Sequence, residues 1–223
     1  MKLLGIVEEI QRAFGGGKAP ADSKFNDRDY LFQKIDEYSA LAIALNYNGG
    51  KIPNSDTVFK GNQHIGAKTW MKFPLTLNPS IQDTGACYVN FDCPEMIMIN
   101  SEKSGFSFVG DQLTMTQFSE MLDPTAFASL TRVKNIEGIY FNQVGDILRV
   151  IGDRDVNQAY VIGRPIKPTQ LAVTYYNPLT DEYPLPDDLI PMMIQIMKSR
   201  EFQQKAATPQ HNVADNNPNM ARQ

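Results

Sequence analysis

The stretch Ile139-Tyr-Phe-Asn-Gln-Val-Gly-Asp-Ile-Leu-Arg-Val-Ile151 decides the fold class of this chain. Apolar residues recur in both halves of it, and the segment Asn142–Asp146 between them carries the polar residues and the glycine of a tight turn. The pattern predicts a β-hairpin. Outward from it, Ala159–Ile162 and Leu171–Tyr176 are predicted to be further strands, so that residues 136–176 form one β block.

An earlier β block is expected between residues 67 and 113. Prolines and a glycine interrupt it and leave four strand candidates, at residues 70–77, 86–93, 96–99 and 106–109. Between the two blocks the sequence predicts two short helices. The first covers Thr116–Leu122. The second covers 124–131, with Asp123 as its N-cap and Pro124 at its first helical position.

Two longer helices complete the body. Residues 27–46 have Asn26 or Asp27 as N-cap and apolar residues at helical spacing, namely Leu31, Ile35, Tyr38, Ala42 and Leu45. A loop is expected over 51–66. The last helix should run from its cap, Asp188, to about Gln204, with Pro191 in its first turn. The sequence therefore predicts an α+β fold, with helices 27–46 and about 188–204 packed against a mixed, mainly antiparallel β region.

The N-terminal residues 1–24 are predicted to hold an amphipathic helix and a hinge. The helix covers 3–14, and the run Gly15–Gly17 stops it. Its apolar face consists of Leu3, Leu4, Val7, Ile10 and Phe14. Either this face packs on the parent domain, residues 25–204, or it docks on a neighbouring subunit.

The C-terminal residues 205–223 have the composition of an extended tail. They contain no aromatic side chain, and Val213 and Met220 are their only aliphatic residues larger than alanine. Such a segment cannot bury enough apolar surface to fold alone. We expect it to contact other chains of an assembly, with a clasp on its own domain as the alternative.

Composition and charge exclude several classes of protein. The chain has 223 residues, of which 42% are hydrophobic and 21% charged, slightly below the usual shares of roughly 45–50% and 25%. With 21 basic and 25 acidic side chains its net charge is −4, the wrong sign for non-specific DNA binding. The first residues lack the apolar run of a signal peptide, and no stretch is long enough to span a membrane. We expect a soluble protein made in a cytoplasm.

The sulfur-containing residues are expected to fill the core. Cys87 and Cys93 lie about 20 Å apart on one straight strand, too far for a disulfide, and their spacing does not match a zinc site. Methionines gather on the last helix, at Met192, Met193 and Met197, and on a strand, at Met96 and Met98. Core filling is the first interpretation, and subunit contact is the alternative.

Candidate catalytic and binding residues give no convincing constellation. Gly15–Gly17 and Lys18 follow a helix rather than a strand, so they do not form a phosphate loop. The two histidines, His64 and His211, lie in polar segments without a nucleophile motif. Two acidic pairs, Asp153 with Asp155 and Asp187 with Asp188, suit turns and helix starts. No catalytic, cofactor-binding or metal-binding residue is predicted.

Several segments, taken in order, carry a family resemblance. They are helix 27–46, a loop, Gln63, the β block with Cys87 and Cys93, the hairpin 139–151, Tyr160-Val-Ile-Gly-Arg-Pro-Ile166, and Glu182-Tyr-Pro-Leu-Pro-Asp-Asp-Leu-Ile-Pro-Met-Met-Ile-Gln-Ile-Met197. This order resembles the head-to-tail connector proteins of short-tailed phages, particularly the crAss-like group. Segment 101–109 departs from the pattern, since it lacks the expected basic and proline positions, and the resemblance does not extend to the glycine hinge or the tail.

The resemblance implies a structural role without catalytic activity. Such proteins form rings, commonly of twelve subunits, that stack below the portal, join capsid to tail and line the channel for DNA. Ring subunits meet through two different faces, and a net acidic chain suits a channel that must not grip DNA. The implied partners are copies of the chain, portal and tail proteins, and passing DNA. The implied location is the virion, without a membrane.

Other functions remain open at this point. The chain could be a different assembly protein, for instance a tail or capsid-associated component or a bacterial scaffold. A metal-dependent hydrolase that uses scattered groups such as His64, Asp153 and Asp187 is a further alternative, and a DNA-binding protein is the last.

Overall fold

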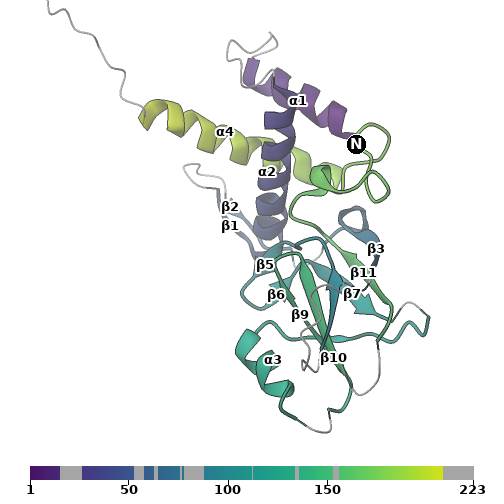
Figure 1. The fold of residues 1–223 in the computed structure, drawn as a ribbon. Coiled ribbons are helices and arrows are strands. Elements are labelled where there is room, and N and C mark those ends of the chain that lie inside the picture. The colour runs from purple at the N-terminus through teal and green to yellow at the C-terminus, as the bar shows by residue number, and fades with distance from the viewer. Residues whose placement is uncertain are drawn as a thin grey trace, which may run out of the picture.

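The structure is a computed structural model that describes residues 1–15, 27–52, 58–62, 65–75, 77, 88–111, 113–133, 136–152 and 156–207. Figure 1 shows the long helices at one end of the molecule and most of the strands at the other. The architecture confirms the predicted α+β fold, in which two long helices pack with mainly antiparallel sheets.

The helical end consists of α1 (Leu3–Gly15), α2 (Arg28–Asn48) and α4 (Ile190–Ala207). Asp27 caps α2, because its side chain accepts hydrogen bonds from the backbone N–H groups of Asp29 and Tyr30. Gly49, with φ 74°, ends the helix. On α4, Glu201 accepts hydrogen bonds from the hydroxyls of Tyr30 (3.2 Å) and Tyr38 (2.9 Å), which join α4 to α2.

Helix α1 packs on its own chain. Its buried face joins the core formed by α2 and α4 and consists of Leu3, Ile6, Val7 and Ile10. Burial of each such side chain contributes roughly 1.5–3 kcal/mol. Of the two alternatives for this helix, the parent-domain contact is therefore the one observed. The predicted hinge, residues 16–24, lies outside the described residues.

The β end consists of two sheets packed face to face. One has the order β4 (Val89–Asp92), β10 (Ile147–Gly152), β9 (Ile139–Val144), β8 (Ser119–Glu120), and the other has β3 (Met71–Leu75), β11 (Ala159–Gly163), β7 (Phe106–Gly110). All pairs are antiparallel except β8 with β9. Phe106 and Phe141 meet between the sheets, with ring centroids 5.1 Å apart. The predicted hairpin is confirmed as β9–β10, with its turn at Gly145 and Asp146.

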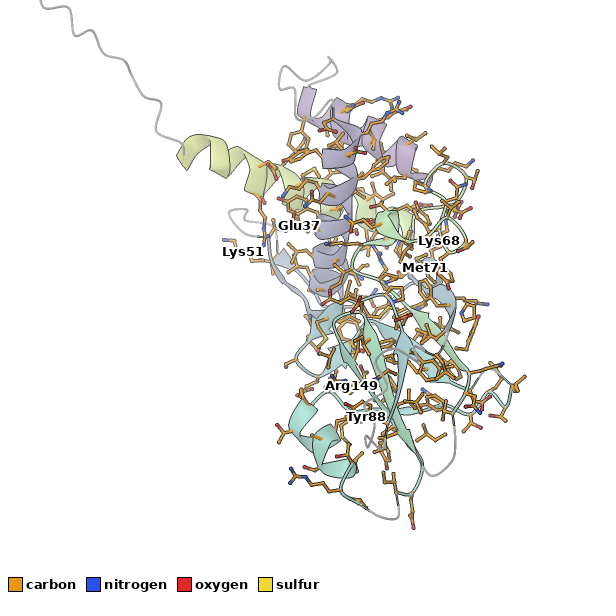
Figure 2. The ribbon with its side chains drawn as sticks, viewed as in Figure 1. Glu37, Lys51, Lys68, Met71, Tyr88 and Arg149 are labelled. Carbon is orange, nitrogen blue, oxygen red and sulfur yellow. The ribbon has the colours of Figure 1, made fainter. Side chains whose placement is uncertain are left out.

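Smaller elements surround these layers. Two-stranded sheets join β1 (Gly50–Lys51) with β2 (Val58–Phe59) and β5 (Met98–Asn100) with β6 (Lys103–Ser104). Short 3-10 helices are η2 (Ala67–Thr69), η4 (Pro168–Gln170) and η5 (Asp187–Leu189). Helix α3 (Pro124–Leu130) begins at Asp123 as predicted. Its Phe127 contacts the ring of Tyr88, over which Arg149 lies (Figure 2).

The loop predicted over 51–66 contains strand β2, which pairs with β1. Two further predicted elements are absent. Residues 116–122 are not a helix, because Phe118 donates its N–H to Val109 (2.7 Å) and the next residues form β8. Residues 171–176 are not a strand, because the N–H groups of Tyr175 and Tyr176 bond back to Ala172 and close a turn. In both places pairing geometry outweighs the local residue pattern.

Two boundaries differ as well. The 3-10 turn η5 precedes α4 and has no side-chain cap, so the predicted capping role of Asp188 is wrong. Pro191 lies in the first turn of α4 as expected, and the helix continues to Ala207, three residues into the predicted tail. Residues 208–223 lie outside the described part of the chain.

Candidate functional site

The residues weighed as chemical candidates are mostly not placed by the structure. His64, Asp153, Asp155, His211, Cys87, Gly16, Gly17 and Lys18 lie outside the described residues. Asp187 and Asp188 are described, and both are exposed. Cys93 is buried and free, and burial raises the pKa of its thiol to about 12. It is therefore a protonated core residue at neutral pH and not a nucleophile.

Asp187 is held by two cations. Its carboxylate lies 2.8 Å from the ammonium of Met1 and 3.2 Å from Nζ of Lys68. Hydrogen bonds from these two groups hold the pKa of Asp187 below its ordinary value. All three groups are at least partly exposed, so we assign the contact a local role, tying the N-terminus to the segment before α4.

A buried polar cluster lies where the helices meet the sheets. Its centre is Asp36 on α2, whose carboxylate accepts hydrogen bonds from the hydroxyl of Tyr183 (2.9 Å) and from the hydroxyl and N–H of Thr169. Only 2% of Asp36 is exposed. Burial raises the pKa of this carboxyl group, while the hydrogen bonds and the charge of Arg164 oppose the rise.

Arg164 supplies the positive charge of the cluster. It follows β11 and is fully buried. Its guanidinium donates to the hydroxyl of Ser39 (2.7 Å), the hydroxyl of Tyr183 (3.1 Å) and the carbonyl of Pro165 (2.8 Å). The hydroxyl of Tyr183 thus accepts a hydrogen bond from Arg164 and donates one to Asp36, so it links the two charged side chains.

The chemistry of this cluster is structural. Its members come from α2, the end of β11 and the segment between η4 and η5, so their bonds fasten helices to sheets. The carboxylate and the guanidinium are buried and each is hydrogen-bonded to the hydroxyl of Tyr183, which leaves them inaccessible to a substrate. Buried charges are tolerated when they are paired and hydrogen-bonded in this way.

A pocket of about 340 Å³ lies at the edges of strands β3 and β4, and we name it the β3–β4 pocket. Its apolar lining includes Phe73, Leu75 and Leu171, and its polar lining includes Asp92 and Asp146. Tyr175 closes one side and packs edge-on against Phe73, with ring centroids 5.5 Å apart.

The two carboxylates of the pocket lie side by side because of the strand register. Asp92 pairs with Ile147, the residue after Asp146. The N–H of Cys93 donates to the carbonyl of Asp146 at 2.9 Å. Both aspartates are exposed. An apolar pocket with adjacent carboxylates at its mouth is suited to a partner that offers an apolar group beside a cation.

Neither site was identified from the sequence. Asp36 and Ser39 lie within the helix predicted over 27–46, but the apolar stripe gave no sign that they face the core too. The segment Tyr160–Ile166, singled out for its resemblance, does contain Arg164. In that segment Arg164 has valine, isoleucine, glycine and proline as sequence neighbours, and this is the one signal that could have indicated a buried cation.

The sequence matches no protein-family model, and no curated protein matches it either. No helix in the described ranges is both long and apolar enough to cross a bilayer. Among those same residues, histidine, cysteine and acidic side chains form no group of three or more that could hold a metal ion.

Proposed function

We propose that the protein is a structural subunit of the head-to-tail connector of a short-tailed bacteriophage, similar to those of the crAss-like group. In this role copies of the chain, commonly twelve, form a ring below the portal. The ring joins capsid to tail and lines the DNA channel, and the subunit has no catalytic activity. The protein is made in the host cytoplasm and then resides in the virion.

The observation that carries the proposal is the ordered set of segments that resemble such connectors, above all Glu182–Met197. In the structure this segment lies at the centre of the subunit. Tyr183 belongs to the buried polar cluster, and Leu185, Leu189 and Met193 belong to the helical core. Because this segment packs into the core, it supports a rigid subunit, and a ring that transmits force needs rigid subunits.

Surface composition supports an assembly role as well. Several large apolar side chains are exposed on loops and short strands, among them Leu113 (82%), Val173 (70%), Val58 (67%) and Leu179 (64%). Exposed apolar groups that recur on different sides of a subunit suit contacts with neighbours. The net charge of −4 suits a channel through which DNA slides.

The test is the composition and image of the particle. Virions purified from cells that produce this chain should contain it in several copies per particle, measured by quantitative mass spectrometry, and their images should show a ring between portal and tail that carries an antibody label. Absence of the chain from purified virions would refute the proposal. Presence elsewhere in the particle would favour a different capsid or tail component.

A further inference from the structure

Two surfaces of the molecule, built from different elements, match each other in charge and apolar character. The first, which we name the hairpin surface, consists of Lys51, Val58 and Lys60. The second is the β3–β4 pocket with Val173 beside it. Figure 1 shows β1 and β2 on the left of the body and β3 on the right, and Figure 2 labels Lys51 of the hairpin surface.

The hairpin surface is apolar and basic. Lys51 and Val58 are directly opposite each other in the antiparallel β1–β2 pair, so their side chains are neighbours. Val58 is 67% exposed, and Lys51 and Lys60 are exposed as well. Lys60 places a positive charge beside Val58 in a chain whose net charge is negative.

The base of the hairpin surface is fixed to the helical end. The N–H of Asn62 donates to the carbonyl of Asn46 near the end of α2, at 2.7 Å. Gly61 lies so close to Asn48 that a Cβ atom there would be 2.8 Å from the backbone. This close approach holds Lys60 at a defined position beside the end of α2.

The pocket surface has the complementary character. Asp92 and Asp146 supply two exposed carboxylates, and Tyr175 is 40% exposed at the pocket wall. Val173 is 70% exposed, two residues before Tyr175 in the same turn. A lysine that enters such a pocket can lay its aliphatic stem along the apolar wall while its ammonium group reaches a carboxylate.

We propose that the hairpin surface of one copy docks into the β3–β4 pocket of the next copy. Val58 covers Val173 and Tyr175, and Lys60 pairs with the carboxylate of Asp146. Because the two surfaces differ, every copy uses both of them, which is the head-to-tail contact from which rings are built. This inference rests on the proposed function, since it names the subunit contact of the ring.

A cysteine pair tests the contact in the full-length chain. Val58→Cys and Val173→Cys are introduced together, and the purified protein is oxidised and run on a non-reducing gel. A ladder of linked subunits is expected, because each interface then holds one cysteine from each neighbour. The matched control pairs Val58→Cys with Val133→Cys, at a valine beyond α3 that is 49% exposed. Wild-type protein accounts for the natural cysteines.

Charge reversal tests the pairing within the contact. Lys60→Glu and Asp146→Lys should each weaken self-association at least about tenfold, measured by analytical ultracentrifugation, because like charges then face each other. The double variant should recover most of the loss. Unchanged far-UV circular dichroism and melting temperature show that each variant is folded.

The outcomes separate this contact from the proposed function. If the wild-type chain stays monomeric, if the ladder is absent, or if the control pair gives the same ladder, the docking inference is overturned. Specific capture of the hairpin by a different protein would overturn it too. A clear ladder with the chain absent from virions would support the contact and refute the connector. A ring in virions without the ladder would support the connector and overturn the docking contact.

Discussion

Asp36 is the residue on which the junction between helices and sheets depends. It is 2% exposed, and its carboxylate accepts hydrogen bonds from Tyr183 and Thr169 near the charge of Arg164. Since burial raises its pKa above the ordinary value of 3.8, Asp36 binds a proton more tightly in the folded state than in the unfolded state. The stability it contributes is therefore complete in acid and falls as the pH rises through the raised pKa.

Asp36→Asn should lower the free energy of unfolding by about 1–3 kcal/mol, because one acceptor of a buried hydroxyl is lost. The gap between wild type and variant should be largest near pH 4 and should narrow towards pH 8. Urea unfolding across about pH 4 to pH 8 measures this gap. Asp188→Asn, at an exposed carboxylate, is the matched control. A gap that widens as the pH rises would contradict the expected fall of the Asp36 contribution with pH.

The methionines separate into core and surface positions. Met192, Met193 and Met197 are buried on α4, and Met96 is buried beside the β core, whereas Met98 is 55% exposed. Core filling, the first interpretation of the sequence, is confirmed for the buried four.

Met193→Ala should cost about 2–5 kcal/mol, because a fully buried side chain leaves a cavity between α4 and its neighbours. Met98→Ala, the matched control, should change the free energy of unfolding of the single chain by less than about 0.5 kcal/mol. Chemical denaturation of both variants measures the difference. Equal costs would show that α4 is not packed as described.

At the scale of elements, the sequence predicts what is locally encoded. Helix α2 has a cap and a continuous apolar stripe, and the β9–β10 hairpin has its own turn, so both were predicted nearly to the residue. The two wrong elements lack such local signals. Residues 116–122 contain apolar residues at helical spacing, but their hydrogen bonds go to β7 and β9, which only the folded topology supplies.

The candidate sites could not be predicted for the same reason. Asp36, Arg164 and Tyr183 meet only after the chain has crossed from α2 to the end of β11 and on to η5. In the β3–β4 pocket, Asp92 and Asp146 become neighbours through strand register. Residue type indicates that a charge needs a partner, but the partner is chosen by tertiary structure.

Gly105 marks the crossing of three backbone segments. Its N–H donates to Ile97 (2.6 Å), and its carbonyl accepts from Arg164 (2.8 Å). A Cβ atom there would lie 2.7 Å from the Ile97 side chain and 2.9 Å from its carbonyl oxygen. The start of β7 therefore requires a residue without a side chain.

Gly105→Ala should lower the melting temperature and cost about 1–3 kcal/mol, because the backbone atoms around it cannot move aside cheaply. Gly5→Ala is the matched control. It lies within α1, where the nearest atom is the flexible Met1 side chain at 3.2 Å, and alanine favours helix. That control should be neutral or stabilising. Differential scanning calorimetry compares the two, and similar losses would contradict the crowding at Gly105.

At the scale of the whole molecule, two hydrophobic cores share one body. One core fills the helical end and the other lies between the sheets, and the partly buried side chains of Met71 and Leu171 pack against both. The buried cluster around Arg164 adds hydrogen bonds across the same junction. Side chains and hydrogen bonds shared across this junction join the two ends more firmly than a linker between separate domains would.

The two ends should therefore unfold in one transition. Trp70, the only tryptophan, lies directly before β3 and reports on the β end through its fluorescence, whereas far-UV circular dichroism at 222 nm reports mainly on the helices. In guanidinium the two signals should give the same midpoint. Arg164→Met should lower both midpoints together. The free energy of unfolding should fall by about 3–5 kcal/mol, because the substitution leaves Asp36 without its countercharge. Midpoints that differ in the wild type, or a variant that shifts only one signal, would show that the two cores fold as independent units.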